Sequence, residues 1–326
     1  MNSLTKADYA LLTKLFEYSE KGLLNAMHSL FSKYYTNIVY KKNKYLIAIS
    51  DTSQIGVVAH CDTVFPSQPS RAEIYYDTHK NVIWSPDGLG ADDRAGVFII
   101  LKLLQKGLKP TIILTTGEET GGIGAQEITK DFPSNDLKLK FLIQLDRRGS
   151  NDCVFYNCGN ADFIKRIESY GFIEKYGTFT DISFLAPAWD IAAVNLSVGY
   201  VDEHSYQERL FISDLLSTFE KIINILSDEK SLPHYKFMEK TYLYNSVNKN
   251  SKPNLGLCDG CNLPLNIDND GVPVINAMGN VEYHCPECFA SICGELNWCS
   301  CCGLPFFGKV GETICQSCIN EGIAND

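Results

Sequence analysis

The sequence lacks any apolar stretch long enough to cross a membrane. A spanning helix needs about 20 consecutive apolar residues, and no run in the 326-residue chain approaches that length. Positive charge is also scarce, because 29 Lys and Arg stand against 39 Asp and Glu, which gives a net charge of −10. Non-specific nucleic-acid binding depends on a basic surface. We therefore expect neither a membrane nor a nucleic acid as a partner.

We also expect no secretory signal. Residues 1–16 carry charges at Lys6 and Asp8 and have the apolar spacing of an amphipathic helix. Only three of the 13 cysteines precede residue 258, whereas ten lie between Cys258 and Cys318. In a chain without a signal, cysteines clustered in this way indicate zinc in a reducing compartment rather than disulfides. We therefore expect a cytoplasmic protein.

Short apolar strands alternate with helical patterns through the first two thirds of the chain. The predicted strands cover residues 38–40, 45–49, 56–59, 110–115, 140–145 and 192–198, and the predicted helices cover 92–105, 124–130, 160–170 and 206–226, after two helices within 1–35. Ser205 and Glu208 have the spacing of a capping box at the start of the last helix. Such alternation predicts an α/β fold with a mainly parallel sheet and helices on both faces.

The composition divides the chain into three parts. Residues 1–228 form the predicted α/β domain, and residues 229–255 are polar and rich in Lys and Asn, as in a linker. Residues 256–326 contain most of the cysteines. We therefore expect one large domain joined by a linker to a small cysteine-rich module.

Five separate segments, most of them directly after an apolar run, carry His, Asp or Glu side chains. They are residues 56–62, 90–93, 116–119, 145–146 and 201–204, and the side chains of interest are His60, Asp62, Asp92, Glu118, Glu119, Asp146 and His204. In an open α/β sheet, ligand sites form beyond the carboxyl ends of the strands. Imidazoles and carboxylates that meet there are suitable ligands for a pair of divalent metals.

Each of these residues also has a simpler interpretation on its own. Asp92 precedes an apolar helix, and its role could simply be that of the helix N-cap. His60 and Asp62 point the same way on an extended strand. This suits a metal-bound imidazole whose orientation is fixed by a carboxylate, but His60 could also simply end a strand and Asp62 begin a turn. Glu118 and Glu119 lie at a buried strand end, where two adjacent carboxylates are costly unless a cation offsets them. Together, the five segments favour one metal site.

The order His-x-Asp, Asp, Glu-Glu, Asp and His resembles that of the co-catalytic zinc exopeptidases, which include peptidase T, the aminoacylases, zinc carboxypeptidases and related aminopeptidases. The segments GADDRAG and TTGEETGGIGA are most similar to the peptidase T branch. The resemblance covers residues 50–225. Many members insert a lid domain before the last histidine, but only 57 residues separate Asp146 from His204 here. We therefore expect the catalytic domain alone.

The resemblance implies two catalytic divalent metals, either zinc or, as alternatives, cobalt and manganese. Asp92 would bridge them. His60 and Asp146 would complete one metal site. Glu119 and His204 would complete the other. The resemblance also implies a strained, often cis, peptide bond after Asp92.

The same resemblance assigns catalytic roles to two further residues. Asp62 would hold His60 in the tautomer that binds metal, and Glu118 would be the general base rather than a ligand. Two zinc ions about 3.5–4 Å apart would share a water and lower its pKa toward neutrality. Glu118 would take the proton of this water, the bridging hydroxide would attack the substrate carbonyl, and Glu118 would return the proton to the leaving amine.

Four CxxC pairs mark the carboxyl-terminal module. They are Cys258/Cys261, Cys285/Cys288, Cys299/Cys302 and Cys315/Cys318. Two pairs close one tetrahedral site, so four pairs predict two structural zinc ions in a zinc-ribbon or treble-clef-like unit. The pairing is either sequential, with the first pair joining the second, or cross-braced, with the first joining the third. Nine acidic residues and one basic residue in 256–326 argue against DNA and favour a protein partner.

The sequence therefore predicts a metallopeptidase, an exopeptidase of the aminopeptidase or di- and tripeptidase kind that acts on short peptides. An N-acyl amino acid deacylase or amidase would use the same metal site and stays an alternative. A third interpretation is a non-catalytic adaptor that binds a partner through its cysteine module.

Overall fold

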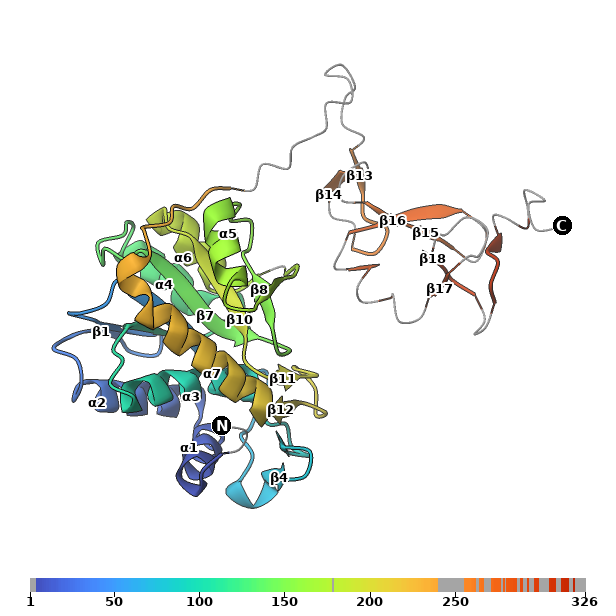
Figure 1. The fold of residues 1–326 in the computed structure, drawn as a ribbon. Helices are drawn as coiled ribbons and strands as arrows, with labels where there is room; N and C mark the ends of the chain where they lie inside the picture. The colour runs from blue at the N-terminus through green and yellow to red at the C-terminus, as the bar shows by residue number, and fades with distance from the viewer. Residues whose placement is uncertain are drawn as a thin grey trace. The chain divides into compact units, whose positions relative to one another are not determined.

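The computed structural model consists of two compact units, Met1–Tyr242 and Leu243–Asp326 (Figure 1). In the first unit it describes residues 4–177 and 179–239. In the second unit it describes residues 255–261, 264–266, 271–276, 278, 280–285, 288–289, 292, 296–298, 305–308, 312–316 and 319. Among these residues, no helix has both the length and the hydropathy needed to cross a bilayer.

The first unit is built on an eight-stranded sheet with the order β1-β2-β6-β3-β7-β10-β8-β9. Its strands are β1 Asn37–Lys41, β2 Tyr45–Ile49, β3 Ile55–His60, β6 Thr111–Thr115, β7 Phe141–Arg147, β8 Asp152–Val154, β9 Ile173–Glu174 and β10 Ala193–Ser197. The central strands β6, β3, β7 and β10 are parallel. Strands β3, β6 and β10 are buried along their whole length, as expected for parallel strands covered on both faces.

Helices cover both faces of this sheet. They are α1 Lys6–Phe16, α2 Glu20–Phe31, α3 Ala91–Gln105, α4 Ile123–Asp131, α5 Ala161–Glu168, α6 Ile182–Trp189 and α7 Ile212–Ser227. Two apolar cores result, because alternate residues of a strand point to opposite faces. In β3, Val57 and Ala59 join the core that contains residues of α3 and α7, whereas Val58 joins the core that contains residues of α4 and α6. The predicted α/β fold with a mainly parallel sheet is therefore confirmed.

A smaller sheet has the order β11-β12-β5-β4. Its strands are β4 Tyr75–Asp77, β5 Val82–Trp84, β11 Tyr200–Val201 and β12 Arg209–Phe211. Strand β12 occupies residues that we expected to lie in the last helix. That helix, α7, begins only at Ile212, because β12 pairs with β5 and the Glu208 side chain accepts hydrogen bonds from distant backbone amides. The predicted helix start near residue 206 is therefore wrong.

The chain stays packed on the first unit beyond α7. A short 3₁₀ helix, η2, covers Glu229–Ser231, and Leu232 and Tyr235 are buried in the larger core. The Lys140 amine donates hydrogen bonds to the backbone carbonyls of Glu229 and Leu232 at 3.0 and 2.7 Å. The segment predicted as a linker, 229–255, therefore begins with residues that contribute to the core of the first unit.

The described residues of the second unit form two small sheets. Strands β13 Leu255–Leu257 and β14 Pro264–Asn266 pair antiparallel. Strands β15 Val272–Ile275, β16 Val281–His284, β17 Asn297–Trp298 and β18 Pro305–Phe306 form a sheet with the order β16-β15-β18-β17. Its apolar core includes Ile275, Phe306 and Cys315. The predicted zinc ligands Cys299, Cys302 and Cys318 lie outside the described residues.

Candidate metal centre

The predicted site residues of the first unit come from the ends of neighbouring strands. His60 ends β3, Glu118 and Glu119 follow β6, and Asp146 lies near the end of β7. Strands β6, β3 and β7 are adjacent and parallel, so their carboxyl ends lie at one edge of the sheet. His204 follows β11 and has a left-handed backbone conformation, with a φ of 62°. The fold thus brings segments that are distant in sequence to one place.

Two groups of polar atoms share the carboxylate of Asp92. His60 Nε2 lies 3.0 Å from Asp92 Oδ1 and 3.4 Å from Asp146 Oδ1. His204 Nε2 lies 3.3 Å from Asp92 Oδ2 and 2.9 Å from Glu119 Oε2. In each group, the three candidate ligand atoms lie within 4.8 Å of one another. Asp92 thus presents one oxygen to each group, as a carboxylate that bridges two metals would.

Asp62 contacts both a histidine and the glutamate pair. Its Oδ1 lies 3.4 Å from His60 Nδ1. Its two oxygens accept hydrogen bonds from the backbone amides of Glu118 and Glu119 at 3.1 and 3.0 Å. Only the contact with His60 was expected from the sequence. Asp62 therefore also fixes the turn that carries both glutamates.

Two further carboxylates hold the backbone around Asp92. The peptide bond between Asp92 and Asp93 is cis, as the resemblance implied. The Asp93 side chain accepts a hydrogen bond from the Gly96 amide at 2.9 Å. Glu208 is only 1% exposed and accepts hydrogen bonds from the amides of Gly90 and Asp92 at 2.6 and 3.0 Å. Sequence patterns assigned Glu208 to a helix cap and missed this contact with the site.

Asp146 is held by hydrogen bonds from three side chains. Thr180 Oγ1 and Gln144 Nε2 donate to its Oδ2 at 2.7 and 2.9 Å. The Tyr200 hydroxyl donates to its Oδ1 at 3.0 Å. Asp181, next to Thr180, is fully buried, and burial raises the pKa of its carboxyl to about 7. The three donors Gln144, Thr180 and Tyr200, which the sequence did not single out, therefore fix the orientation of the Asp146 carboxylate.

The charge of the site is predominantly negative. Burial, and then the nearby Asp146 carboxylate, raises the pKa of Glu118 to about 9. Burial and the charge of Asp92 raise the pKa of Asp146 to about 6. Hydrogen bonds to Asp92 and Glu119 raise the pKa of His204 to about 11. Such shifts arise where carboxylates outnumber the cations that balance them, so this mixed set of imidazoles and carboxylates fits a pair of divalent metals.

A cavity of about 360 Å³ opens over these residues. All the candidate ligands except His60 line it, together with Glu118, Arg147, Arg148, Tyr156, Phe179 and Glu203, among others. Arg148 Nη1 lies 3.2 Å from Glu203 Oε1, and Arg147 Nη2 donates to the backbone carbonyl of Tyr176 at 3.1 Å. A larger hollow of about 680 Å³ contains none of the predicted metal ligands. The smaller cavity is therefore the candidate substrate site.

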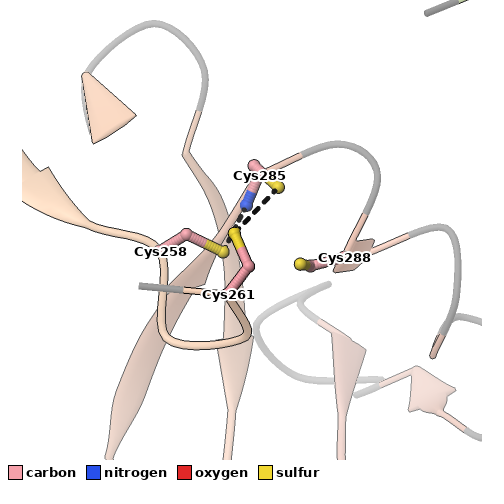
Figure 2. A group of neighbouring side chains, drawn as sticks. All are labelled: Cys258, Cys261, Cys285 and Cys288. Carbon is pink, nitrogen blue, oxygen red and sulfur yellow. Dashed lines mark hydrogen bonds between the residues drawn. The ribbon is translucent and has the colours of Figure 1, made fainter. Parts of the chain in front are cut away.

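In the second unit, the first two predicted cysteine pairs lie together. The Sγ atoms of Cys258, Cys261, Cys285 and Cys288 lie within 4.8 Å of one another (Figure 2). Cys315, the only described member of the last two pairs, is fully buried in the small apolar core. The described part of the module thus contains one group of four neighbouring sulfurs.

No protein-family model matches the chain, and no curated protein matches its sequence. A solved tripeptidase from Staphylococcus aureus has a TM-score of 0.58 and 14% identity, covering 71% of this chain and 100% of that one. Aminopeptidase PepT from Bacillus cereus has a TM-score of 0.52 and 16% identity, covering 68% and 98%. A TET aminopeptidase from a marine sediment archaeon of the Thaumarchaeota has a TM-score of 0.52 and 12% identity, covering 68% and 97%. At these identities the likeness establishes a shared fold.

Proposed function

We propose that the first unit is a metallopeptidase, an exopeptidase that cleaves short peptides with the help of two divalent metal ions. One observation carries the proposal: the two oxygens of Asp92 face two histidines, and each histidine also faces a second carboxylate. The shared fold with a tripeptidase and two aminopeptidases agrees with it. Zinc suits this mixture of nitrogen and oxygen ligands, and cobalt and manganese are alternatives.

In this proposal Asp92 would contribute a ligand to each of the two ions. His60 and Asp146 would hold the first ion with it, and Glu119 and His204 would hold the second. Glu119 supports the assignment, because its Oε1 is buried and has no hydrogen-bond partner in the described part of the chain. Three protein ligands at each ion leave positions for water and substrate, which is the arrangement that catalysis needs.

Glu118 is the proposed general base. Bound cations would supply a water of lowered pKa and polarise the carbonyl of the scissile bond. Burial and the neighbouring carboxylate charges raise the pKa of Glu118, and two bound cations would offset those charges and thereby keep this side chain ionised. The Glu118 carboxylate lines the cavity beside the candidate ligands, where it would take a proton from the attacking water and deliver it to the nitrogen of the leaving amine. Asp62 would act as a positioning residue, because it binds the Glu118 amide and lies against His60.

The cavity favours a short peptide with free termini. Its volume of about 360 Å³ is at the small end for ligand pockets. Arg147 and Arg148 line it and offer guanidinium groups that suit a substrate carboxylate. Glu203 lines it too. Its Oε1 pairs with Arg148 Nη1 at 3.2 Å, whereas its Oε2 has no hydrogen-bond partner among the residues described and is the acceptor left for a free α-amine. An N-acyl amino acid lacks that amine, and Glu203 therefore favours the peptidase over the deacylase.

A substrate panel with the purified full chain tests this proposal. Amino-acid amides and di- and tripeptides should be hydrolysed, whereas N-acetyl amino acids with the same side chains should not. Hydrolysis of the N-acetyl compounds alone would replace the peptidase with the deacylase. A chain that cleaves neither class and binds no metal through His60 would instead be the non-catalytic adaptor.

A further inference from the structure

The four neighbouring cysteines of the second unit belong to two turns that face each other. Cys258 and Cys261 follow β13, Cys285 and Cys288 follow β16, and the sulfurs converge between them (Figure 2). Cys261 Sγ lies 4.0 Å from Cys285 Sγ. A disulfide would require about 2 Å, whereas four sulfurs at about 2.3 Å from one tetrahedral zinc lie about 3.8 Å apart. The spacing therefore fits a shared metal ion.

Backbone contacts hold these two turns together. The Asp259 amide donates to the Tyr283 carbonyl at 3.0 Å, and the Tyr283 amide donates to Asp259 Oδ2 at 2.7 Å. The Cys285 amide donates to Cys258 Sγ at 3.2 Å. Such donors support sulfur as a thiolate, the form that binds metal. The contact of the first CxxC turn with the second therefore does not depend on the cysteine side chains alone.

Gly260 permits the closest approach between the turns. A Cβ atom at this position would lie 2.9 Å from both the Sγ and the Cβ of Cys288 and 3.1 Å from His284 Nδ1. Carbon atoms in contact prefer separations of about 3.5–4 Å, so any larger residue would push Cys288 away. The first turn is thus shaped to receive the second pair of cysteines.

We propose that these four cysteines bind one structural zinc ion, so that the first CxxC pair joins the second. The ligands would be Cys258, Cys261, Cys285 and Cys288. Four thiolates complete the tetrahedral shell and leave no position for a substrate, so the ion stabilises the unit and takes no part in catalysis. The thiol protons are released to solvent when the ion binds. The sequence left sequential and cross-braced pairing open, and this geometry selects the sequential one.

Zinc counts in two double variants of the full chain test the pairing. C258S/C261S removes one whole pair, and C258S/C285S removes one cysteine from each pair. Sequential pairing predicts that both variants lose the same number of zinc ions relative to the unaltered chain, because both disable the same site. Under sequential pairing the two losses stay equal even if disruption of this site also releases zinc from elsewhere in the second unit, because both variants start from the same disrupted site. Cross-braced pairing would make C258S/C285S lose one more ion than C258S/C261S, because it would damage two sites.

Inductively coupled plasma mass spectrometry gives the zinc content per chain, and Cys153→Ala is the control. Cys153 is fully buried in the first unit, so its variant should keep every ion. An extra ion lost from C258S/C285S, or no loss from either double variant, would overturn the proposal. The outcome is independent of the peptidase proposal, because differences in zinc content between these variants do not involve His60 or its neighbours.

Discussion

The two candidate metal sites in the described part of the chain are assembled in opposite ways. The proposed ligands of the first unit come from separate segments between His60 and His204 and meet only where the large sheet ends, whereas the four sulfurs lie between Cys258 and Cys288. The first site has three protein ligands for each proposed ion, and the second has four for one. A metal site that must admit substrate needs a large scaffold and a free coordination position. A small unit with little core instead gains stability from an ion whose coordination positions are all filled by protein ligands.

Chelation should separate the two sites most strongly. A chelator added to the full chain should abolish peptide hydrolysis while zinc stays on the cysteine site, because an incomplete ligand shell lets the chelator bind before the protein ligands leave. The His204 side chain, which is 54% exposed, lies on the accessible side of the first site. Hydrolysis rate and retained zinc should be measured in the same samples, and added zinc should restore the rate. Loss of zinc from both sites at the same chelator concentration would contradict the predicted difference in accessibility between the two sites.

Glu118→Gln should produce the next largest effect. Hydrolysis should fall by about 10²–10⁴-fold, the usual contribution of general acid–base catalysis, while metal content stays unchanged because Glu118 is not a proposed ligand. Glu119→Gln is the matched control. Glu119 is a proposed ligand that neighbours Glu118 in the sequence, so this variant should lose metal together with activity. Turnover numbers and zinc content distinguish the two variants. Full activity in Glu118→Gln would show that another group is the base.

Glu208→Gln should have a smaller effect on the first site. The carboxylate accepts from the amides of Gly90 and Asp92, and an amide side chain would turn a donor toward one of them. Groups that orient ligands typically contribute about 10–100-fold to metal affinity or activity. After chelation, the zinc concentration that restores hydrolysis should therefore be about 10–100-fold higher for this variant than for the unaltered chain. Gln207→Ala, at an exposed neighbouring residue, should leave it unchanged, and an unchanged requirement in Glu208→Gln would remove Glu208 from the site.

The first site shows how far local patterns extend into a fold. His60 and Asp146 could be placed together from the sequence, because each ends an apolar run and the carboxyl ends of parallel strands share one edge. Glu208 could not, because Ser205 and Glu208 have the spacing of a local helix cap. In the folded chain β12 pairs with β5 instead, and the carboxylate is left for the Asp92 amide. Tertiary pairing overrode a local signal.

The second site shows the opposite limit. The four CxxC pairs have the same spacing, so no local property of a pair indicates its partner. The choice depends on contacts between the turns, such as those of Asp259 with Tyr283, and neither residue has a sequence signature. The sequence therefore indicated the candidate ligands of this site, but not which CxxC pairs lie together.

Gly260→Ala should give the smallest effect and tests the closed site directly. The added methyl group would lie 2.9 Å from Cys288 Sγ. We expect an overpacking cost at the low end of the usual range, about 1 kcal/mol, which corresponds to about fivefold weaker zinc binding. Competition with a chromogenic chelator measures this affinity. The zinc requirement of hydrolysis in the same variant is the internal control and should not change. Unchanged zinc affinity at the cysteine site would mean that the turn carrying Cys288 can move without weakening zinc binding. Close packing of Cys288 against Gly260 would then not be what brings the two CxxC pairs together.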